Sequence, residues 1–112
     1  MRGAPGGESR KLLQLAAQIR RSLETTLVGE CPDEVLQNIS VESVEPAPGN
    51  RMLVTLMVHP PGDALPKDEV LRRLDAARAL LVHRVVEDVH RRAIPELSFW
   101  LVRAPTPETP SN

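Results

Sequence analysis

Residues 90–99 read His-Arg-Arg-Ala-Ile-Pro-Glu-Leu-Ser-Phe and mark a change from helix to strand. Pro95 disfavours the helical conformation of the residue before it, so the helix must end at or before Ile94. Apolar residues follow the proline at every second position, at Leu97, Phe99 and Leu101. This alternation predicts a strand over about residues 96–103.

Three basic or titratable residues precede the proline, namely His90, Arg91 and Arg92. We expect them in the last turn of the helix, where the helix dipole favours cations. Taken alone, the stretch is typical of a capped helix that leads into a strand.

A long amphipathic helix is predicted upstream of this stretch. Pro66 suits its first position, and Asp68 and Glu69 supply acid to the first turn. A helix of roughly 25 residues is long for a domain of this size, which predicts a break or bend. The small trio Ala-Arg-Ala at 77–79 is the place for it. The apolar stripe consists of Val70, Leu74, Ala77, Leu81 and Val85.

An opening helix and two strands precede it. Ser9 suits the N-cap, Gly29 suits the C-cap, and the residues between them carry one apolar stripe. The stripe consists of Leu12, Leu15 or Ala16, Ile19, Leu23 and Leu27. A strand is predicted over about 38–45, with a bulge where the alternation slips between Ser43 and Val44.

A turn cluster at 46–50 joins this strand to another at 51–59, which is apolar on both faces and should therefore be central. The element order is α-β-β-α(kinked)-β. It predicts an α+β, two-layer, KH type II-like domain, with a three-stranded mixed sheet and helices on one face. The last strand–helix–strand unit should be a right-handed crossover between parallel strands. Val54, Leu56, Leu74 and Leu81 should share one core, and one of Phe99 and Trp100 should face it.

The chain is 112 residues long, which suits a single domain over 9–103. We expect a disordered leader over 1–8 and a disordered Pro-rich tail over 104–112. The single Cys31 cannot form an internal disulfide, and no apolar run is long enough to span a membrane or serve as a signal. The protein is therefore expected to be cytoplasmic.

No constellation for catalysis is evident. His83, Glu87 and His90 share one helical face, but they are spread too far along it to hold one metal ion. Cys31 has no histidine nearby in sequence, and no Gly-rich phosphate loop occurs. We therefore predict a protein that is not an enzyme, with no catalytic residue, no metal and no cofactor.

The charges leave two interpretations open. The formal net charge is -1, from 14 basic and 15 acidic residues, so RNA binding would have to come from a local patch. On an unbroken helix, Arg73, Arg84 and Arg91 fall within about 20° of each other and form a basic stripe that suits a phosphate backbone. The alternative is a solvated face whose arginines pair with Asp75, Glu87 and Asp88.

Three pieces of the chain resemble the ribosome-binding factor A family, which has a type II KH-like domain. The first is the stretch at 91–99, in which two basic residues precede a Pro-Glu-Leu-x-Phe motif. The second is the Leu-x-x-Ala spacing at Leu74 and Ala77, and the third is the Ala-Gln-Ile-Arg-Arg-Ser-Leu segment at 17–23. The resemblance covers about 9–103. It departs from the family at Ala79, where glycine is usual, at Val82, where a basic residue is usual, and at 31–36, which lacks an arginine.

This resemblance implies a ribosome assembly factor. It would bind 16S ribosomal RNA in the immature small (30S) subunit, as a monomer, and assist maturation and 5′-end processing. The alternative is a KH-like protein–protein module that docks through the open sheet face or the first helix without direct RNA contact. The basic stripe and its neighbours, taken together with this resemblance, predict an RNA-binding set of Arg73, Ala77, Arg78, Ala79, Arg84, His90, Arg91 and Arg92.

Overall fold

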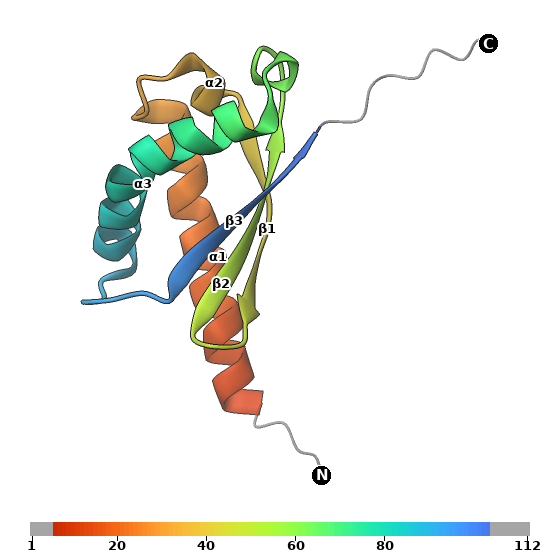
Figure 1. Cartoon of the computed structure of the whole chain (residues 1–112). Coiled ribbons are helices and arrows are strands. Elements are labelled where there is room, and N and C mark those ends of the chain that lie inside the picture. The colour runs from red at the N-terminus through yellow and green to blue at the C-terminus, as the bar shows by residue number, and fades with distance from the viewer. Residues whose placement is uncertain (1–5, 104–112) are drawn as a thin grey trace, which may run out of the picture.

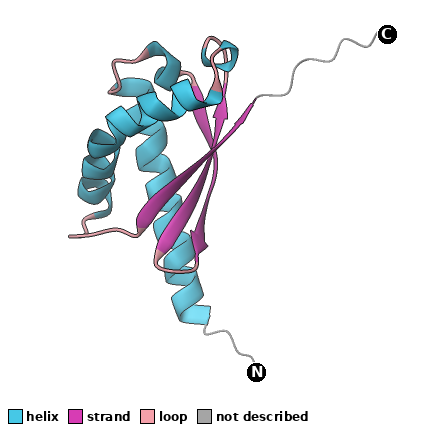
Figure 2. Ribbon diagram, in the orientation of Figure 1, coloured by secondary structure: helices cyan, strands magenta, loops and turns pink. Residues whose placement is uncertain are grey.

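The computed structural model describes residues 6–103 as a two-layer α+β domain (Figure 1). Its helices cover one face of a three-stranded mixed sheet and leave the other face open (Figure 2). This is the predicted fold class and element order, apart from two short helical segments that were not predicted. The elements are α1 (Gly6–Gly29), α2 (Glu34–Gln37), β1 (Ile39–Ala47), β2 (Arg51–Val58), η1 (Gly62–Ala64), α3 (Lys67–Val89) and β3 (Glu96–Arg103).

The sheet has the order β1-β2-β3, with β2 in the middle as predicted. β1 and β2 pair antiparallel, and β2 and β3 pair parallel across the α3 crossover. The predicted bulge exists, but it lies at Glu42, since Val41 pairs with Leu56 and Ser43 with Thr55. The alternation in the sequence therefore located the bulge slightly too far along the strand.

The hairpin between β1 and β2 is tighter than predicted. β1 continues to Ala47, so residues 46 and 47 belong to the strand and only residues 48–50 form the turn. Gly49 and Asn50 have positive φ values of 83° and 56°, a conformation that glycine and asparagine adopt most readily. Pro46 is tolerated in β1 because β1 is an edge strand.

The start of α1 corrects the sequence analysis. The helix begins at Gly6, so Ser9 lies inside it and is not its N-cap. The leader predicted over 1–8 overlaps this helix at 6–8, while residues 1–5 and the predicted tail at 104–112 lie outside the described residues. Gly29 is the last residue of the helix and has no positive φ, so it lies one position before the C-cap that was predicted for it.

α3 bends without breaking. It is one continuous helix of 23 residues, and its axis changes direction about halfway along (Figure 1). The predicted bend therefore forms with alanine at position 79. Pro66 is the N-cap, with an extended backbone, and lies one residue before the helix that it was expected to begin.

The end of α3 also differs from the prediction. The helix stops at Val89, because His90 takes a left-handed conformation with φ 55° and ψ 44°. The amide of His90 then donates to the Glu87 carbonyl and that of Arg91 to the Val86 carbonyl, which closes the helix end. His90, Arg91 and Arg92 therefore follow the helix and do not lie in its last turn.

The core lies between the helices and the inner face of the sheet. Val54, Leu56, Leu74 and Leu81 are all buried within it, as predicted. On β3, Phe99 packs against this core, whereas Trp100 lies on the opposite face with 60% of its surface exposed. None of the helices in the described part of the chain is long and apolar enough to span a membrane.

Candidate nucleic-acid interface

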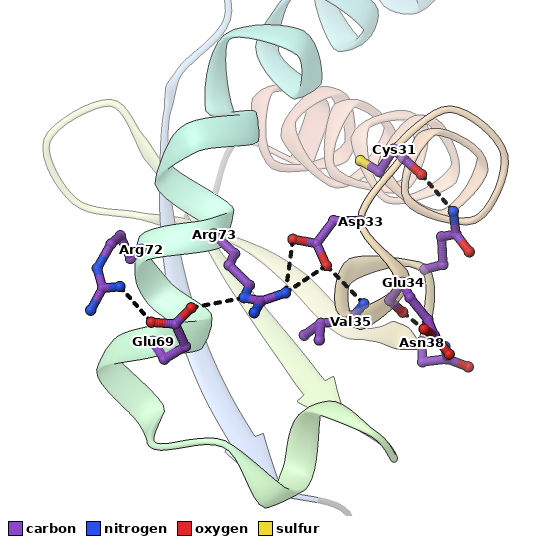
Figure 3. Close-up of polar contacts among 9 residues, drawn as sticks. Cys31, Asp33, Glu34, Val35, Asn38, Glu69, Arg72 and Arg73 are labelled. Carbon is purple, nitrogen blue, oxygen red and sulfur yellow. Dashed lines mark hydrogen bonds and ion pairs between the residues drawn. The ribbon is translucent and has the colours of Figure 1, made fainter.

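Arg73 lies on the first half of α3 and is held by two carboxylates. One of its terminal nitrogens is 3.1 Å and 3.3 Å from the two carboxylate oxygens of Asp33, and its Nε is 3.0 Å from Glu69 (Figure 3). The hydrogen bond from Arg73 is the main reason that the pKa of Glu69 is lowered, and the same bond raises the pKa of Arg73. Glu69 also pairs with Arg72. The guanidinium group of Arg73 is thus already paired with two carboxylates of the protein itself.

The carboxylate of Asp33 has a second role. It accepts a 2.8 Å hydrogen bond from the amide of Val35 and so caps the N-terminus of α2 (Figure 3). Asp33 therefore shapes the connector between α1 and β1 and also holds an arginine of α3.

Arg84 lies on the second half of α3 and is engaged in the same way. Its Nε donates to Glu30 at 2.7 Å, and a terminal nitrogen donates to Glu87 at 2.9 Å. The bond to Glu30 is the largest cause of the raised pKa of Arg84. Glu87 also lies 3.3 Å from the His83 ring. The ordinary ion pairing considered for this face therefore occurs at Glu87.

Arg78 lies in the middle of α3 and reaches β3. Its guanidinium donates to the Leu97 carbonyl and lies over the Phe99 ring, 5.2 Å from the ring centroid. These contacts form one side of an open groove of about 670 Å³ between α3 and β3. The groove carries charges of both signs, because Arg72, Asp75 and Glu96 also line it.

The two alanines of the bend differ in exposure. Ala79 is exposed, whereas Ala77 is half-buried and lines an open, mostly apolar hollow of about 320 Å³ beside the connector. The other residues that line this hollow are Pro32, Asp33, Leu36, Arg73, Ala76 and Leu80.

His90, Arg91 and Arg92 form an exposed segment between α3 and β3. Within residues 6–103 their side chains make no ion pair, unlike those of Arg73 and Arg84. Asp88 anchors the helix end just before them by accepting a 2.6 Å hydrogen bond from Ser22 of α1. Arg21 lines the same surface hollow as Asp88, so it is a basic residue near this segment that the sequence analysis did not include.

The predicted basic stripe is wrong. Arg91 lies beyond the end of α3 and so is not on the helix, whereas Arg73 and Arg84 both contact the segment at 30–33. The structure instead separates the predicted residues into the engaged arginines of α3 and the exposed segment at 90–92. The acidic partners Glu30 and Asp33 were also missed, because they lie 54 and 40 residues from the arginines they contact.

Two observations bear on a catalytic or metal site in the described part of the chain. No cluster of three or more His, Cys, Asp and Glu residues there could hold a metal ion. The Ser40 hydroxyl lies 2.9 Å from His59 Nε2, but Glu42 contacts Ser40 and not the histidine. A nucleophile–base–orienter triad needs the acid on the histidine, so these three residues do not form one.

No family model and no curated protein matches the chain. Six chains in solved structures do match it. The crystal structure of ribosome-binding factor A from Thermus thermophilus matches with a TM-score of 0.66 at 25% identity, over 80% of this chain and 93% of that one. This chain has the ribosome-binding factor A fold.

A second match supports this assignment. It is a homology model of the Thermus thermophilus ribosome-binding factor A, fitted into a cryo-EM map of a 30S complex of that protein. Its TM-score is 0.59 at 26% identity, and the match covers 76% of this chain and 88% of that one. The likeness to ribosome-binding factor A predicted from the sequence is thereby confirmed.

Proposed function

We propose that this protein is a ribosome assembly factor that binds 16S ribosomal RNA in the immature small subunit and assists its maturation and 5′-end processing. The observation that carries the proposal is the fold shared with ribosome-binding factor A. A homology model of the Thermus thermophilus protein was fitted into the cryo-EM map of its 30S complex. The buried, unpaired thiol of Cys31 suits a reducing cytoplasm, where the protein would act as a monomer.

The proposed mode of action is binding without catalysis, so no cofactor is required. RNA affinity comes mainly from cations that neutralise phosphates, and a cation already paired with a carboxylate contributes less. We therefore assign the first phosphate contacts to Arg91 and Arg92, whose side chains are exposed, with His90 beside them. The remaining residues of the proposed surface are Arg73, Ala77, Arg78, Ala79 and Arg84.

Co-sedimentation with ribosomal particles tests this proposal. Arg91→Glu with Arg92→Glu should abolish association with free small subunits and leave the circular dichroism spectrum unchanged, because exposed charge reversals perturb the fold by only about half a kcal/mol each. Arg10→Glu with Lys11→Glu is the matched control. It makes the same change in charge at two adjacent exposed positions near the start of α1. The proposed surface is wrong if the control pair abolishes association and the Arg91 and Arg92 pair does not.

The open sheet face supports a second candidate, a protein–protein module without RNA contact. Trp100 and Val102 are 60% and 40% exposed on the face of the sheet opposite the helices. Apolar docking persists as salt rises, whereas phosphate binding weakens steeply. Association that survives high salt and is lost in Trp100→Ala would favour this second function.

A further inference from the structure

The connector between α1 and β1 contacts α3 on both sides of its bend. Glu30 pairs with Arg84 at 2.7 Å, and Asp33 pairs with Arg73 at 3.1 Å. Arg73 belongs to the first half of α3 and Arg84 to the second, so two acidic side chains of one short segment engage the arginines on either side of the bend.

The surface between these two ion pairs is apolar and hollow. Ala76, Ala77 and Leu80 of α3 line it from one side, and Pro32 and Leu36 line it from the connector side. The connector therefore lies beside this part of α3, and its two carboxylates accept hydrogen bonds from the guanidinium groups of Arg73 and Arg84.

We propose that the connector at residues 30–33 is an acidic cover over a second phosphate-binding surface, in which Glu30 and Asp33 occupy the donors of Arg84 and Arg73 that RNA phosphates take when RNA binds. This inference rests on the RNA binding proposed above and concerns how that surface is regulated.

The chemistry allows such an exchange. Carboxylate and phosphate oxygens both accept paired hydrogen bonds from a guanidinium group, so a phosphate can replace a carboxylate with little change in geometry. Both pairs are also open to solvent, with side chains 25% to 39% exposed. Exposed pairs are weak, so releasing the cover costs little.

Each arginine keeps a second partner on its own helix. Arg73 retains Glu69, and Arg84 retains Glu87, at three or four residues' distance along α3. These contacts keep both guanidinium groups in place when the connector carboxylates leave. The two guanidinium groups beneath the cover are thus already positioned to bind phosphates. The cover lowers the affinity for an RNA that contacts only this surface of the protein.

Neutralising one cover residue at a time gives the direct test. Glu30→Gln should tighten binding to a single-stranded RNA of mixed sequence about threefold at constant salt, because the pair it removes is an exposed one. Asp33→Asn should act similarly, and asparagine preserves the cap on α2. Glu34→Gln is the matched control. It removes one exposed charge at the first residue of α2, directly after the connector, and the side chain of Glu34 has no ion pair within the described residues.

A double-mutant cycle separates the cover from a general effect of charge. In the presence of Arg84→Gln, Glu30→Gln should no longer tighten binding, since its proposed target is gone. An equal gain from Glu30→Gln and Glu34→Gln, or a gain that persists with Arg84→Gln, would overturn the cover while leaving RNA binding intact. Failure of every form, wild type included, to bind RNA would overturn the proposed function and the cover together.

Discussion

The hydroxyl of Ser22 donates a 2.6 Å hydrogen bond to the carboxylate of Asp88, which ties the middle of α1 to the last turn of α3. Ser22 is buried, with 3% of its surface exposed, whereas Asp88 lies at the surface. The bond therefore holds the last turn of α3, just before the exposed segment at 90–92, against α1.

Asp88→Ala should lower the free energy of unfolding by about 0.5–1.5 kcal/mol, because it leaves the buried hydroxyl without this acceptor. Urea denaturation measures the change. Asp88→Asn keeps an acceptor oxygen and should lose less. Equal losses in the two variants would show that the hydrogen bond does not stabilise the junction of α1 and α3.

Periodicity in the sequence was sufficient to predict the layers of this fold, since the apolar stripes of α1 and α3 and the alternation in β3 each follow a regular repeat. The ends of the elements were harder. His90 ends α3 through a left-handed backbone conformation, and no residue pattern distinguishes that conformation from one more helical turn. α2 has four residues, too few for any repeat to appear.

Gly62 should tolerate no side chain. A Cβ atom there would lie 2.8 Å from Cγ1 of Val35 and 3.0 Å from Cγ1 of Val58, and both valines are buried. Gly62→Ala should therefore destabilise the protein by about 1–3 kcal/mol, the usual cost of overpacking a core. Thermal denaturation would show a lower midpoint.

Gly29→Ala is the control for this substitution. A Cβ atom at Gly29 meets nothing within 4 Å, and the residue closes α1. Alanine favours the helix over glycine, so this variant should be neutral or gain up to about 1 kcal/mol. A comparable loss in both variants would indicate that the crowding at Gly62 is relieved by movement of the valines.

Cys31 should react slowly in the folded protein. Its side chain is 2% exposed, and burial raises its pKa above the usual 9.0, with the charges of Asp33 and Glu30 acting in the same direction. A raised pKa means less thiolate, and the thiolate is the reactive form. Labelling with a thiol reagent at about pH 8 should be at least about tenfold slower than in denaturant. Equal rates would show that the connector opens readily.

The candidate site was less accessible to sequence reasoning than the fold. The basic residues could be identified in the sequence. Whether Arg73 and Arg84 are free to bind a phosphate depends on Glu30 and Asp33, which contact them because the connector folds back on α3. The exposed segment at 90–92 was identified, although it was placed on the helix. A charge pattern along one helix thus cannot show which arginines are already paired with distant carboxylates.

The last prediction concerns acid. Hydrogen bonding from Arg73, with a further contribution from Arg72, lowers the pKa of Glu69 below the usual 4.5. A carboxyl with a lower pKa in the folded state binds its proton less tightly there than in the unfolded chain. Its contribution to stability is therefore fully present above pH 4.5 and is lost as the pH falls through the folded pKa.

Glu69→Gln should accordingly make the melting temperature less sensitive to acid. Between about pH 6 and pH 3, the melting temperature of the wild type should fall further than that of the variant, and the two should converge at the acidic end. Glu34→Gln removes an exposed carboxyl that has no ion pair in the described chain, and it should follow the wild-type curve. If Glu69→Gln also followed the wild-type curve, the pairing of Glu69 with Arg73 would not stabilise the first half of α3.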